Sequence, residues 1–390
     1  MMFASLTLPT NLGPDTLQIP FNKPNYTGKE NDYMAQAMAN GKISGGGEFT
    51  KRCQDFFKTK YGFNNCLLTN SCTAALEMAA ILIDIKPGDE VIMPSYTFVS
   101  TANAFVLRGA KIVFADSSQL HPNMDVETLE ELITPKTKAI VAVHYAGNAC
   151  NMELLLELAN KHKVYLIEDA AQAIDGFYMF DDGSRKPLGS IGHLAAFSFH
   201  DTKNIISGEG GLLVINDKKF VERAEIIWEK GTDRSKFIRG ETMSYGWVDI
   251  GSSFLPSELT AAFLFAQLEE MEQIQKKRIE IWNHYNDLFA NSNFETPNIP
   301  EYSTNNAQMY YIVLDSIKQR NSIIEHCKKA GINTAFHYLP LHQSNYYNTQ
   351  HDGRELPNCT RFANGLLRLP LYCDLGLDEV EYVVDTIMQL

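Results

Sequence analysis

Three short polar motifs follow apolar runs in the first part of the chain, and each carries residue types that could do chemistry. Thr69–Ala75 (TNSCTAA) opens a predicted helix, Glu168–Gln172 (EDAAQ) ends a predicted strand, and Phe197–Asn204 (FSFHDTKN) places Lys203 in a polar turn. A helix N-terminus can bind phosphate through its free N–H groups and its dipole. A strand-end acid can pair with a cationic ring nitrogen or a metal, and a partly buried lysine can bond covalently to a carbonyl carbon.

Each motif also has an ordinary structural interpretation. Ser71 or Thr73 could simply cap a helix, Asp169 could cap the segment that follows it, and a lone lysine is usually a surface residue. The stretch Ser207–Gly211 (SGEGG) lacks the GxxxxGK[ST] pattern of a nucleotide-binding loop. Its glycines are expected to let the chain turn and approach a ligand. No histidine lies at ligand spacing near Asp169, so no metal site is expected.

The combination of the three motifs favours one shared site. A phosphate-binding helix start, a strand-end Asp and a loop Lys occur in this order along one α/β unit. These are the protein groups that an enzyme dependent on pyridoxal 5′-phosphate (PLP) requires. In such an enzyme Asp169 keeps the pyridine nitrogen protonated, Lys203 bonds to the cofactor aldehyde, and the helix start anchors the phosphate.

Alternating buried strands and helices must position these motifs. Strands are expected over 91–94, 111–115, 139–143, 164–167, 195–199 and 211–215, with helices over 73–84, 125–133 and 152–162. This alternation predicts an α/β fold with a mostly parallel, mixed sheet sandwiched by helices, whose C-terminal strand ends hold the ligand.

The pattern changes after Gly251. Residues 256–290 predict one long amphipathic helix that could bend, and the strand over 309–314 and helices over 317–330 and 378–390 predict a smaller α+β domain. The expected organisation is therefore a tail at 1–18, a large PLP-binding domain at 19–250, and the long helix with the small domain at 251–390.

Composition narrows the class of protein. The 390 residues carry 34 Lys and Arg against 47 Asp and Glu, for a net charge of −13, which disfavours nucleic acid as a partner. The apolar stretch Val91–Leu107 contains Pro94 and several hydroxyl side chains and is slightly short for a membrane span. The first cation is Lys23, so no secretory signal is expected. Seven cysteines without C-x-x-C spacing favour free thiols in a cytoplasmic protein.

Six motifs resemble those of the DegT/DnrJ/EryC1/StrS sugar aminotransferases, which are PLP enzymes of fold-type I. The resemblance runs from about Ile19 to the C-terminus. The motifs are IPFNKP (19–24), NSCTAAL (70–76), GDEVIMPSYTFV (88–99), VHYAG (143–147), IEDAAQ (167–172) and FSFHDTKN (197–204). The segments DIGSSFLPSEL (249–259) and FHYLPLH (336–342) are similar to the branch that makes the dTDP-4-amino sugar of enterobacterial common antigen.

The resemblance implies a role for each matching residue. Lys203 would hold the cofactor and carry the proton, with Asp169 on the pyridine nitrogen and Gln172 facing the phenolic oxygen. The remaining cofactor contacts would come from Phe98 stacked on the ring and from Cys72, Thr73 and Ser198 on the phosphate. Many relatives place an Asn from the partner subunit on the phosphate and often an Arg nearby. This chain has Ser253 and Leu255 at those positions, and a serine could reach the phosphate through water.

Substrate contacts are expected from two further groups of residues. Lys230, Arg234, Lys236 and Arg239 share one loop that resembles a lining of the sugar-nucleotide cleft, although a solvated charged loop is an equal alternative. The second group contains residues that could approach the sugar or the amino donor, or pack at a domain edge: His144, Tyr145, His337, Tyr338 and His342.

The resemblance implies a homodimer with interfacial sites that moves the amino group of L-glutamate to C4 of a nucleotide-linked 4-keto-6-deoxy sugar. The alternatives are a sugar 3-aminotransferase, a 4-aminotransferase of opposite stereochemistry, a sugar 3-dehydratase, or a non-catalytic sugar-nucleotide sensor. Dehydratases of this family carry His in place of the lysine, so Lys203 argues against that activity. A Rossmann dehydrogenase is excluded because no GxGxxG follows an early strand.

Overall fold

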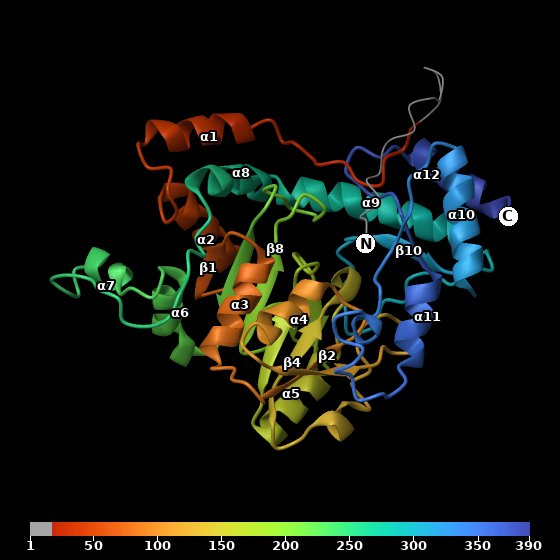
Figure 1. Cartoon of the computed structure of the whole chain (residues 1–390). Helices are drawn as coiled ribbons and strands as arrows, with labels where there is room; N and C mark the ends of the chain where they lie inside the picture. Colours follow the sequence, from red (N-terminus) through yellow and green to blue (C-terminus); the bar gives the residue numbers. More distant parts are fainter. Residues whose placement is uncertain (1–17) are drawn as a thin grey trace.

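The computed structural model describes residues 18–390, and its centre is a seven-stranded sheet (Figure 1). Only β9 runs against the common direction of its strands, because it is antiparallel to both of its neighbours. In spatial order the strands are β1 (Cys66–Thr69), β9 (Gly211–Ile215), β8 (Leu194–Ser198), β5 (Tyr165–Asp169), β4 (Thr137–Val143), β2 (Glu90–Pro94) and β3 (Lys111–Ala115). The predicted fold class is confirmed, while the predicted tail at 1–18 lies almost wholly outside the described residues.

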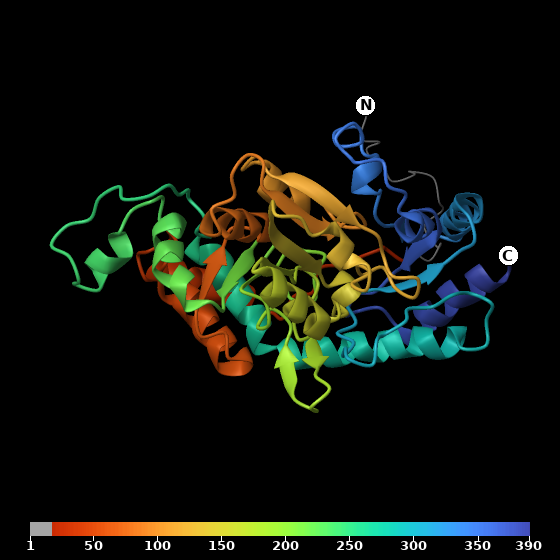
Figure 2. The same cartoon turned by 90° about the horizontal axis from the view of Figure 1, so that it is seen from below.

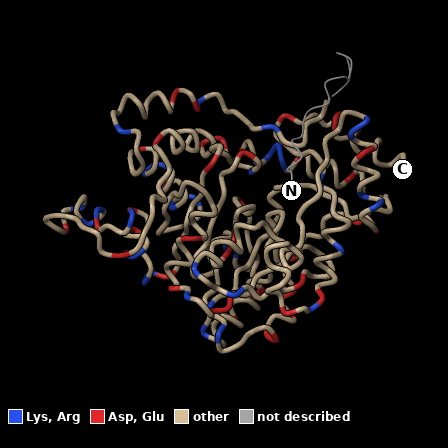
Figure 3. The backbone as a smooth tube through the Cα atoms, in the orientation of Figure 1, with Lys and Arg blue, Asp and Glu red and all other residues tan. Residues whose placement is uncertain are grey.

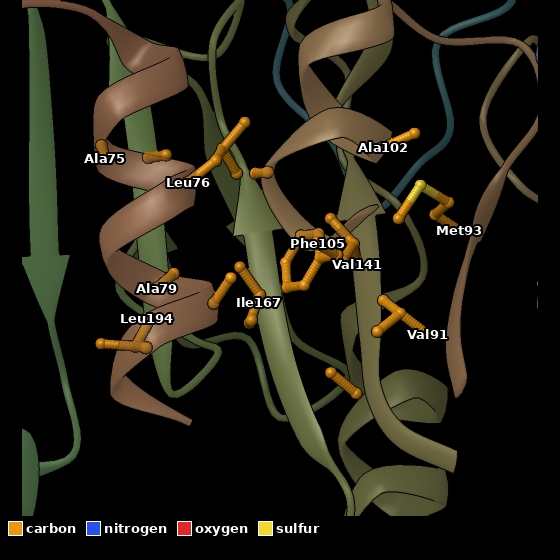
Figure 4. Close-up of a cluster of buried hydrophobic side chains, with 14 of the residues drawn as sticks. Ala75, Leu76, Ala79, Val91, Met93, Ala102, Phe105, Val141, Ile167 and Leu194 are labelled. Atoms are coloured by element: carbon orange, nitrogen blue, oxygen red, sulfur yellow. The ribbon is translucent and has the colours of Figure 1, made fainter. Parts of the chain in front are cut away.

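Helices cover both faces of this sheet. The covering helices are α2 (Glu48–Tyr61), α3 (Cys72–Leu82), α4 (Val99–Val106), α5 (Met152–His162), α6 (Val221–Trp228) and α8 (Glu258–Glu269). Successive residues of one strand point to opposite faces, so Val91 and Met93 join the core beneath α3 and α4, whereas Ile92 joins the core beneath α2, α5 and α8. Figure 4 shows the first of these cores, in which Leu76 and Phe105 meet Val141 and Ile167. Burial on both faces explains the nearly continuous apolar strand sequences.

The C-terminal part adds a smaller sheet. Its strand order is β10 (Tyr310–Val313), β12 (Leu366–Leu369) and β11 (Ala335–Phe336), all antiparallel. The helices of this part are α9 (Met271–Phe289), α10 (Ile317–Lys329), α11 (Pro357–Gly365) and α12 (Leu377–Met388). A separate apolar cluster that includes Tyr285, Tyr310 and Val383 packs this region together.

Two expected helices differ from the structure. The long helix expected over 256–290 is two helices in line, α8 and α9, interrupted at Glu270, whose backbone has φ −100° and ψ 10° (Figures 1 and 2). The helix expected over 125–133 is only a 3₁₀ turn at Leu129–Leu132. There the Asp125 side chain accepts from the Glu127 N–H and the Thr128 hydroxyl, and such local bonds compete with helix formation.

The remaining elements lie at the periphery. Helix α1 (Glu30–Ala39) packs along α8, and β6 (Phe177–Met179) pairs with β7 (Arg185–Pro187) in a hairpin. Other 3₁₀ turns span Tyr145–Gly147, Lys218–Phe220 and Leu341–Gln343. None of the helices within residues 18–390 combines the length and the apolar character needed to traverse a bilayer.

A segment at residues 230–250, called here the arm, projects from the body (Figures 1 and 2). It contains the short helix α7 (Arg234–Ile238) and exposes large apolar side chains, with Met243 97% and Trp247 84% exposed. Charges of both signs are interspersed along it (Figure 3).

Candidate active site

A cavity of about 620 Å³ opens where β4, β5 and β8 end. Its floor comes from the large sheet and the start of α3, and its opposite wall comes from Phe336–Leu339 and Arg368 of the smaller sheet. Ten of the sequence-predicted residues line it, and eight of these belong to the large domain: Cys72, Thr73, Phe98, His144, Asp169, Gln172, Ser198 and Lys203. His337 and Tyr338 line the other wall. The cavity therefore unites motifs that are far apart in the sequence.

Asp169 is the last residue of β5, and its carboxylate is buried at the cavity floor. The Thr101 hydroxyl donates to Oδ2 at 2.7 Å, and the Ala171 N–H donates to Oδ1 at 3.2 Å. Burial raises the pKa of the carboxyl, while these two bonds and the nearby Lys203 oppose that rise. A carboxylate held this way can face a cationic ring nitrogen.

Lys203 follows β8 in a turn that is held in place by hydrogen bonds of the next residue. The neighbouring Asn204 side chain donates to the Gln275 Oε1 at 2.9 Å and to the Asn306 carbonyl at 2.8 Å. Burial lowers the pKa of the Lys203 amine, whereas the Cys72 thiol and Asp169 raise it. A lysine with a lowered pKa presents more of the neutral amine that attacks an aldehyde.

The start of α3 is shaped as an anion site. The Ser71 hydroxyl caps the helix by accepting from the Ala74 N–H at 3.1 Å, and helix geometry leaves the N–H groups of Cys72 and Thr73 without intrahelical acceptors. A Cβ on Gly211 of β9 would overlap the Ser71 carbonyl carbon and the Cys72 nitrogen. Glycine at 211 therefore allows β9 to pass directly under this turn, and the free N–H groups fit a cofactor phosphate.

Gln172 and Phe98 line the same cavity as Asp169 and Lys203. Gln172 Oε1 accepts from the Ala146 N–H at 2.6 Å, and its Nε2 donates to the Tyr338 hydroxyl at 3.1 Å. Phe98 is 56% exposed although it is a large apolar residue at the cavity wall. An exposed ring at this place is available to stack on a flat cofactor.

Three of the predicted substrate residues are already engaged within the chain. His144 is fully buried, with Nε2 3.0 Å from the Glu168 carboxylate and Nδ1 accepting from the Cys150 N–H. Tyr145 is buried behind the wall and its hydroxyl lies 3.0 Å from His337 Nδ1. His342 does not line the cavity, because its Nδ1 bonds to the Ser95 hydroxyl at 2.7 Å.

The predicted cationic loop is the arm, and it lies outside the cavity of its own chain. Arg234 pairs with Glu229 at 2.8 Å, Arg239 with Glu225 at 2.8 Å, and Lys230 with Glu229 at 3.7 Å. Lys236 pairs with Glu222. These cations are thus partly neutralised within the chain.

Ser253 is exposed next to the anion site but does not line the cavity of the same chain. Its carbonyl accepts from the Asn70 side chain at 3.3 Å, and Asn70 directly precedes Ser71. Its hydroxyl therefore faces no cofactor position within one chain, and any phosphate contact would need a second copy.

The structure adds residues that sequence reasoning missed. Thr101 holds Asp169, Ser100 accepts from the Thr73 hydroxyl at 2.8 Å, and Arg368 and Phe21 line the cavity. A signal existed for Arg368, since it is a lone cation inside the apolar strand Leu366–Leu369. Nothing in the spacing of Thr101 relates it to a carboxylate 68 residues later.

Known proteins resemble this chain over nearly its whole length. A sequence profile of the DegT/DnrJ/EryC1/StrS aminotransferase family matches residues 24–388. The spore coat polysaccharide biosynthesis protein SpsC of Bacillus subtilis is 31% identical over 382 residues, which are 95% of this chain and 97% of SpsC. An uncharacterized protein of Methanocaldococcus jannaschii, MJ1066, is 33% identical over 88% of this chain and 90% of its own length.

Solved structures agree with the sequence comparison. Spr1654 from Streptococcus pneumoniae, a proposed sugar aminotransferase, superposes with a TM-score of 0.87 at 27% identity in its pyridoxamine phosphate form, covering 95% of this chain and 98% of that one. It was also solved in a PLP form. DesV of S. venezuelae, solved with a ketimine intermediate, gives a TM-score of 0.85 at 26% identity, covering 96% of this chain and 98% of DesV.

Site geometry and comparisons lead to one assignment. The anion site, Asp169 and Lys203 fit PLP, and the chain matches an aminotransferase family from residue 24 to residue 388. The protein is therefore a PLP-dependent enzyme that belongs to the DegT/DnrJ/EryC1/StrS family of sugar aminotransferases.

Proposed function

We propose that the enzyme transfers the amino group of L-glutamate to the C4 ketone of a nucleotide-linked 4-keto-6-deoxy sugar. The proposed acceptor is dTDP-4-oxo-6-deoxy-D-glucose and the proposed product is dTDP-4-amino-4,6-dideoxy-D-galactose. The observation that carries the transamination chemistry is the convergence of Lys203, Asp169 and the start of α3 on one cavity. The similarity to a polysaccharide biosynthesis protein supports a role in making a surface glycan, such as enterobacterial common antigen or O-antigen.

Each residue has a distinct task in this proposal. PLP, when bound, supplies an aldehyde that captures amino groups and a ring that accepts the electron pair left at the substrate carbon. Asp169 accepts from Thr101 at the cavity floor, and its carboxylate would favour a protonated ring nitrogen. The N–H groups of Cys72 and Thr73, with the Ser198 hydroxyl at the end of β8, hold the phosphate. Phe98 and Gln172 fix the plane of the ring from the side.

Lys203 moves the proton. Its amine is displaced when the donor arrives, and in the neutral form that burial favours it can take the proton from the donor Cα. The same amine then returns a proton to C4 of the sugar in the second half of the cycle. One base suffices because the two substrates occupy the same place in turn.

We also propose that two copies of the chain form a homodimer in the cytoplasm, with each arm lying against the partner. The support is the exposure of Met243, Trp247 and Val248 on a projecting segment, since large exposed apolar side chains usually mark an interaction surface. In such a dimer the cations of the arm and Ser253 would approach the partner's cavity and its diphosphate-bearing ligand. Neither nucleic acid nor membrane is a proposed partner.

The decisive experiment incubates the purified holoenzyme with L-glutamate and a panel of dTDP- and UDP-linked 3-keto and 4-keto sugars. The expected product is a 4-amino sugar with an axial amine, identified by NMR. A 3-amino product or an equatorial amine would assign one of the alternative aminotransferases instead. A protein that binds the sugar nucleotide but transfers no amino group from any donor would support the sensor alternative.

A further inference from the structure

Asn306 does not line the cavity, yet it binds two of the segments that do. It is 1% exposed and precedes β10 in the C-terminal part of the chain. Its Nδ2 donates to the carbonyl of Gln172 at 2.8 Å and to that of Ile174 at 2.9 Å. Its own carbonyl accepts from the Asn204 side chain at 2.8 Å. One buried residue thus connects Gln172 to the residue that follows Lys203.

The residue that precedes Lys203 is bound by the same segment of the chain. The Gln308 side chain donates from Nε2 to the Thr202 carbonyl at 3.2 Å. The Gln308 N–H donates in turn to Asn306 Oδ1 at 3.1 Å. Both neighbours of Lys203 are therefore hydrogen-bonded to residues 306–308.

The backbone of this segment has a conformation that needs support. Ala307 has φ 52°, in the left-handed region that a residue with a Cβ rarely occupies. The Asn305 side chain accepts from the Ala307 N–H at 2.8 Å, and Arg278 of α9 donates to the carbonyls of residues 307 and 308. Such strained backbone persists only where its surroundings determine it, and it is concentrated at functional sites. The segment is therefore held in one geometry beside the turn of Lys203.

A third segment of the site packs against the Asn306 side chain. Gly147 of the VHYAG motif has φ 80°, and a Cβ there would overlap Asn306 Oδ1. The N–H of the preceding residue, Ala146, donates to Gln172 Oε1 at 2.6 Å. Glycine at 147 thus allows the backbone to approach Asn306 closely. The orientation of the Asn306 amide is also determined, because Nδ2 faces two carbonyls and Oδ1 faces an N–H.

We propose that Asn306 is a positioning residue that fixes the amine of Lys203 relative to the cofactor edge that Gln172 faces. The inference rests on the roles proposed above for Lys203 and Gln172. Asn306 contacts neither of the two substrates in this proposal and acts through the segments that it joins. Proton transfer requires close and aligned atoms. Movement of one segment relative to the other should therefore slow the chemical step and leave substrate binding almost unchanged.

Asn306→Ala tests this role in the holoenzyme. The maximal rate of the half-reaction with L-glutamate should fall on the order of 30-fold, about 2 kcal/mol. The half-saturating glutamate concentration should stay within about twofold of the wild-type value. Glutamate deuterated at Cα should show a larger kinetic isotope effect in the variant than in the wild type, because proton transfer becomes the slow step.

The bound cofactor gives a readout without substrate. Its visible absorbance changes when the bond to the lysine gains or loses a proton, and the pH midpoint of this change depends on the geometry between lysine and ring. The midpoint should move by at least about half a pH unit in Asn306→Ala, or about 0.7 kcal/mol. The PLP affinity should change less than about threefold, because the hydrogen bonds of Asn306 within residues 18–390 reach neither Asp169 nor the start of α3.

Asn123→Ala is the matched control. Asn123 is 2% exposed, its Nδ2 donates to the carbonyls of residues 148 and 149, and its Oδ1 accepts from the Tyr145 N–H. Neither residue 148 nor residue 149 lines the cavity. This variant should lose thermal stability as Asn306→Ala does, yet keep the wild-type maximal rate, isotope effect and pH midpoint.

Asn204→Ala interrupts the same connection at its other end and also serves if Asn306→Ala does not fold. It should lower the maximal rate in the same way. The effects of the two substitutions should not add in the double variant, because both residues belong to one hydrogen-bonded unit.

Two results would overturn the positioning role of Asn306. One is an unchanged maximal rate and an unchanged pH midpoint in Asn306→Ala or, if that variant does not fold, in Asn204→Ala. The other is an equal loss of rate, substrate binding and PLP affinity that Asn123→Ala reproduces, which would leave Asn306 only a contribution to stability. Borohydride reduction and peptide mapping of the wild type test the underlying role separately, since a cofactor attached elsewhere than at Lys203 would refute the proposed function itself.

Discussion

Thr101→Val isolates the hydrogen bond that keeps the carboxylate of Asp169 charged. Valine preserves the shape of the buried side chain and removes the hydroxyl that donates to Asp169 at 2.7 Å and that also bonds to the Thr97 hydroxyl. A hydrogen bond to a charged group contributes roughly 1.5–3 kcal/mol. Its loss should raise the pKa of Asp169 further above the ordinary value, in the same direction as burial already does.

The sign of the pH dependence follows from this shift. In the cofactor-free protein the folded-state pKa of Asp169 lies above the ordinary value of 3.8, so the contribution of Asp169 to stability is lost as pH rises through that pKa. Cofactor binding needs the charged carboxylate. At about 1.4 kcal/mol per tenfold change, the variant should therefore bind PLP about 10- to 100-fold less tightly than the wild type at low pH. This difference in PLP affinity should disappear as pH rises above the pKa of Asp169 in the variant.

The assay is a titration of cofactor-free protein with PLP, followed by absorbance between about pH 5 and pH 8. Thr97→Val is the matched control, because the Thr97 hydroxyl bonds to the Thr101 hydroxyl at 2.9 Å rather than to Asp169 itself. Thr97→Val should lower the PLP affinity at low pH less than Thr101→Val does. In an Asp169→Asn background the Thr101 substitution should have no pH-dependent effect. An affinity loss that is independent of pH, or that persists in the Asp169→Asn background, would refute the reasoning.

Three further predictions concern Lys203, Gly211 and the arm. Lys203→Ala should abolish the visible absorbance of the lysine-bound cofactor and lower turnover by several orders of magnitude, each tenfold step being about 1.4 kcal/mol. The control Lys218→Ala should keep both the absorbance and the turnover. Full turnover in Lys203→Ala would exclude the role assigned to Lys203. Gly211→Ala should weaken PLP binding on the order of tenfold, because the added methyl group would displace the Ser71–Cys72 backbone. An unchanged PLP affinity in the same titration would contradict the requirement for glycine at this position. Trp247→Ser, at a side chain that is 84% exposed, should shift sedimentation toward monomer without lowering the thermal midpoint of the monomer, and an unaltered mass would remove the arm from the proposed interface.

Sequence reasoning succeeded where local patterns determine structure. The strands of the large sheet are buried on both faces, so their apolar runs stand out between amphipathic helices. The motifs around Asp169 and Lys203 lie directly at strand ends, where the parallel sheet itself brings them to one edge. Cofactor and fold could therefore be predicted without any long-range contact.

Sequence reasoning stayed incomplete where long-range packing decides. His144 lines the cavity as predicted, but the sequence did not show that its imidazole contacts the buried Glu168, which also accepts from the N–H groups of residues 189, 191 and 192. The break at Glu270 cannot be read from an uninterrupted helical sequence. Arg368 reaches the cavity only because the smaller sheet packs against the larger one.

The hydrogen bonds that hold Asn204 would limit how the amine of Lys203 travels in the proposed cycle. Gln275 of α9 and the backbone of Asn306 bind the side chain of the residue next to Lys203, which restrains the backbone of the lysine while its four methylene groups can rotate. In the proposed cycle, the amine that the donor displaces would therefore stay close to the carbon to which it next gives a proton. Shuttling between two unlike substrates then needs only bond rotations that take nanoseconds or less, and no loop has to refold between the halves of a cycle.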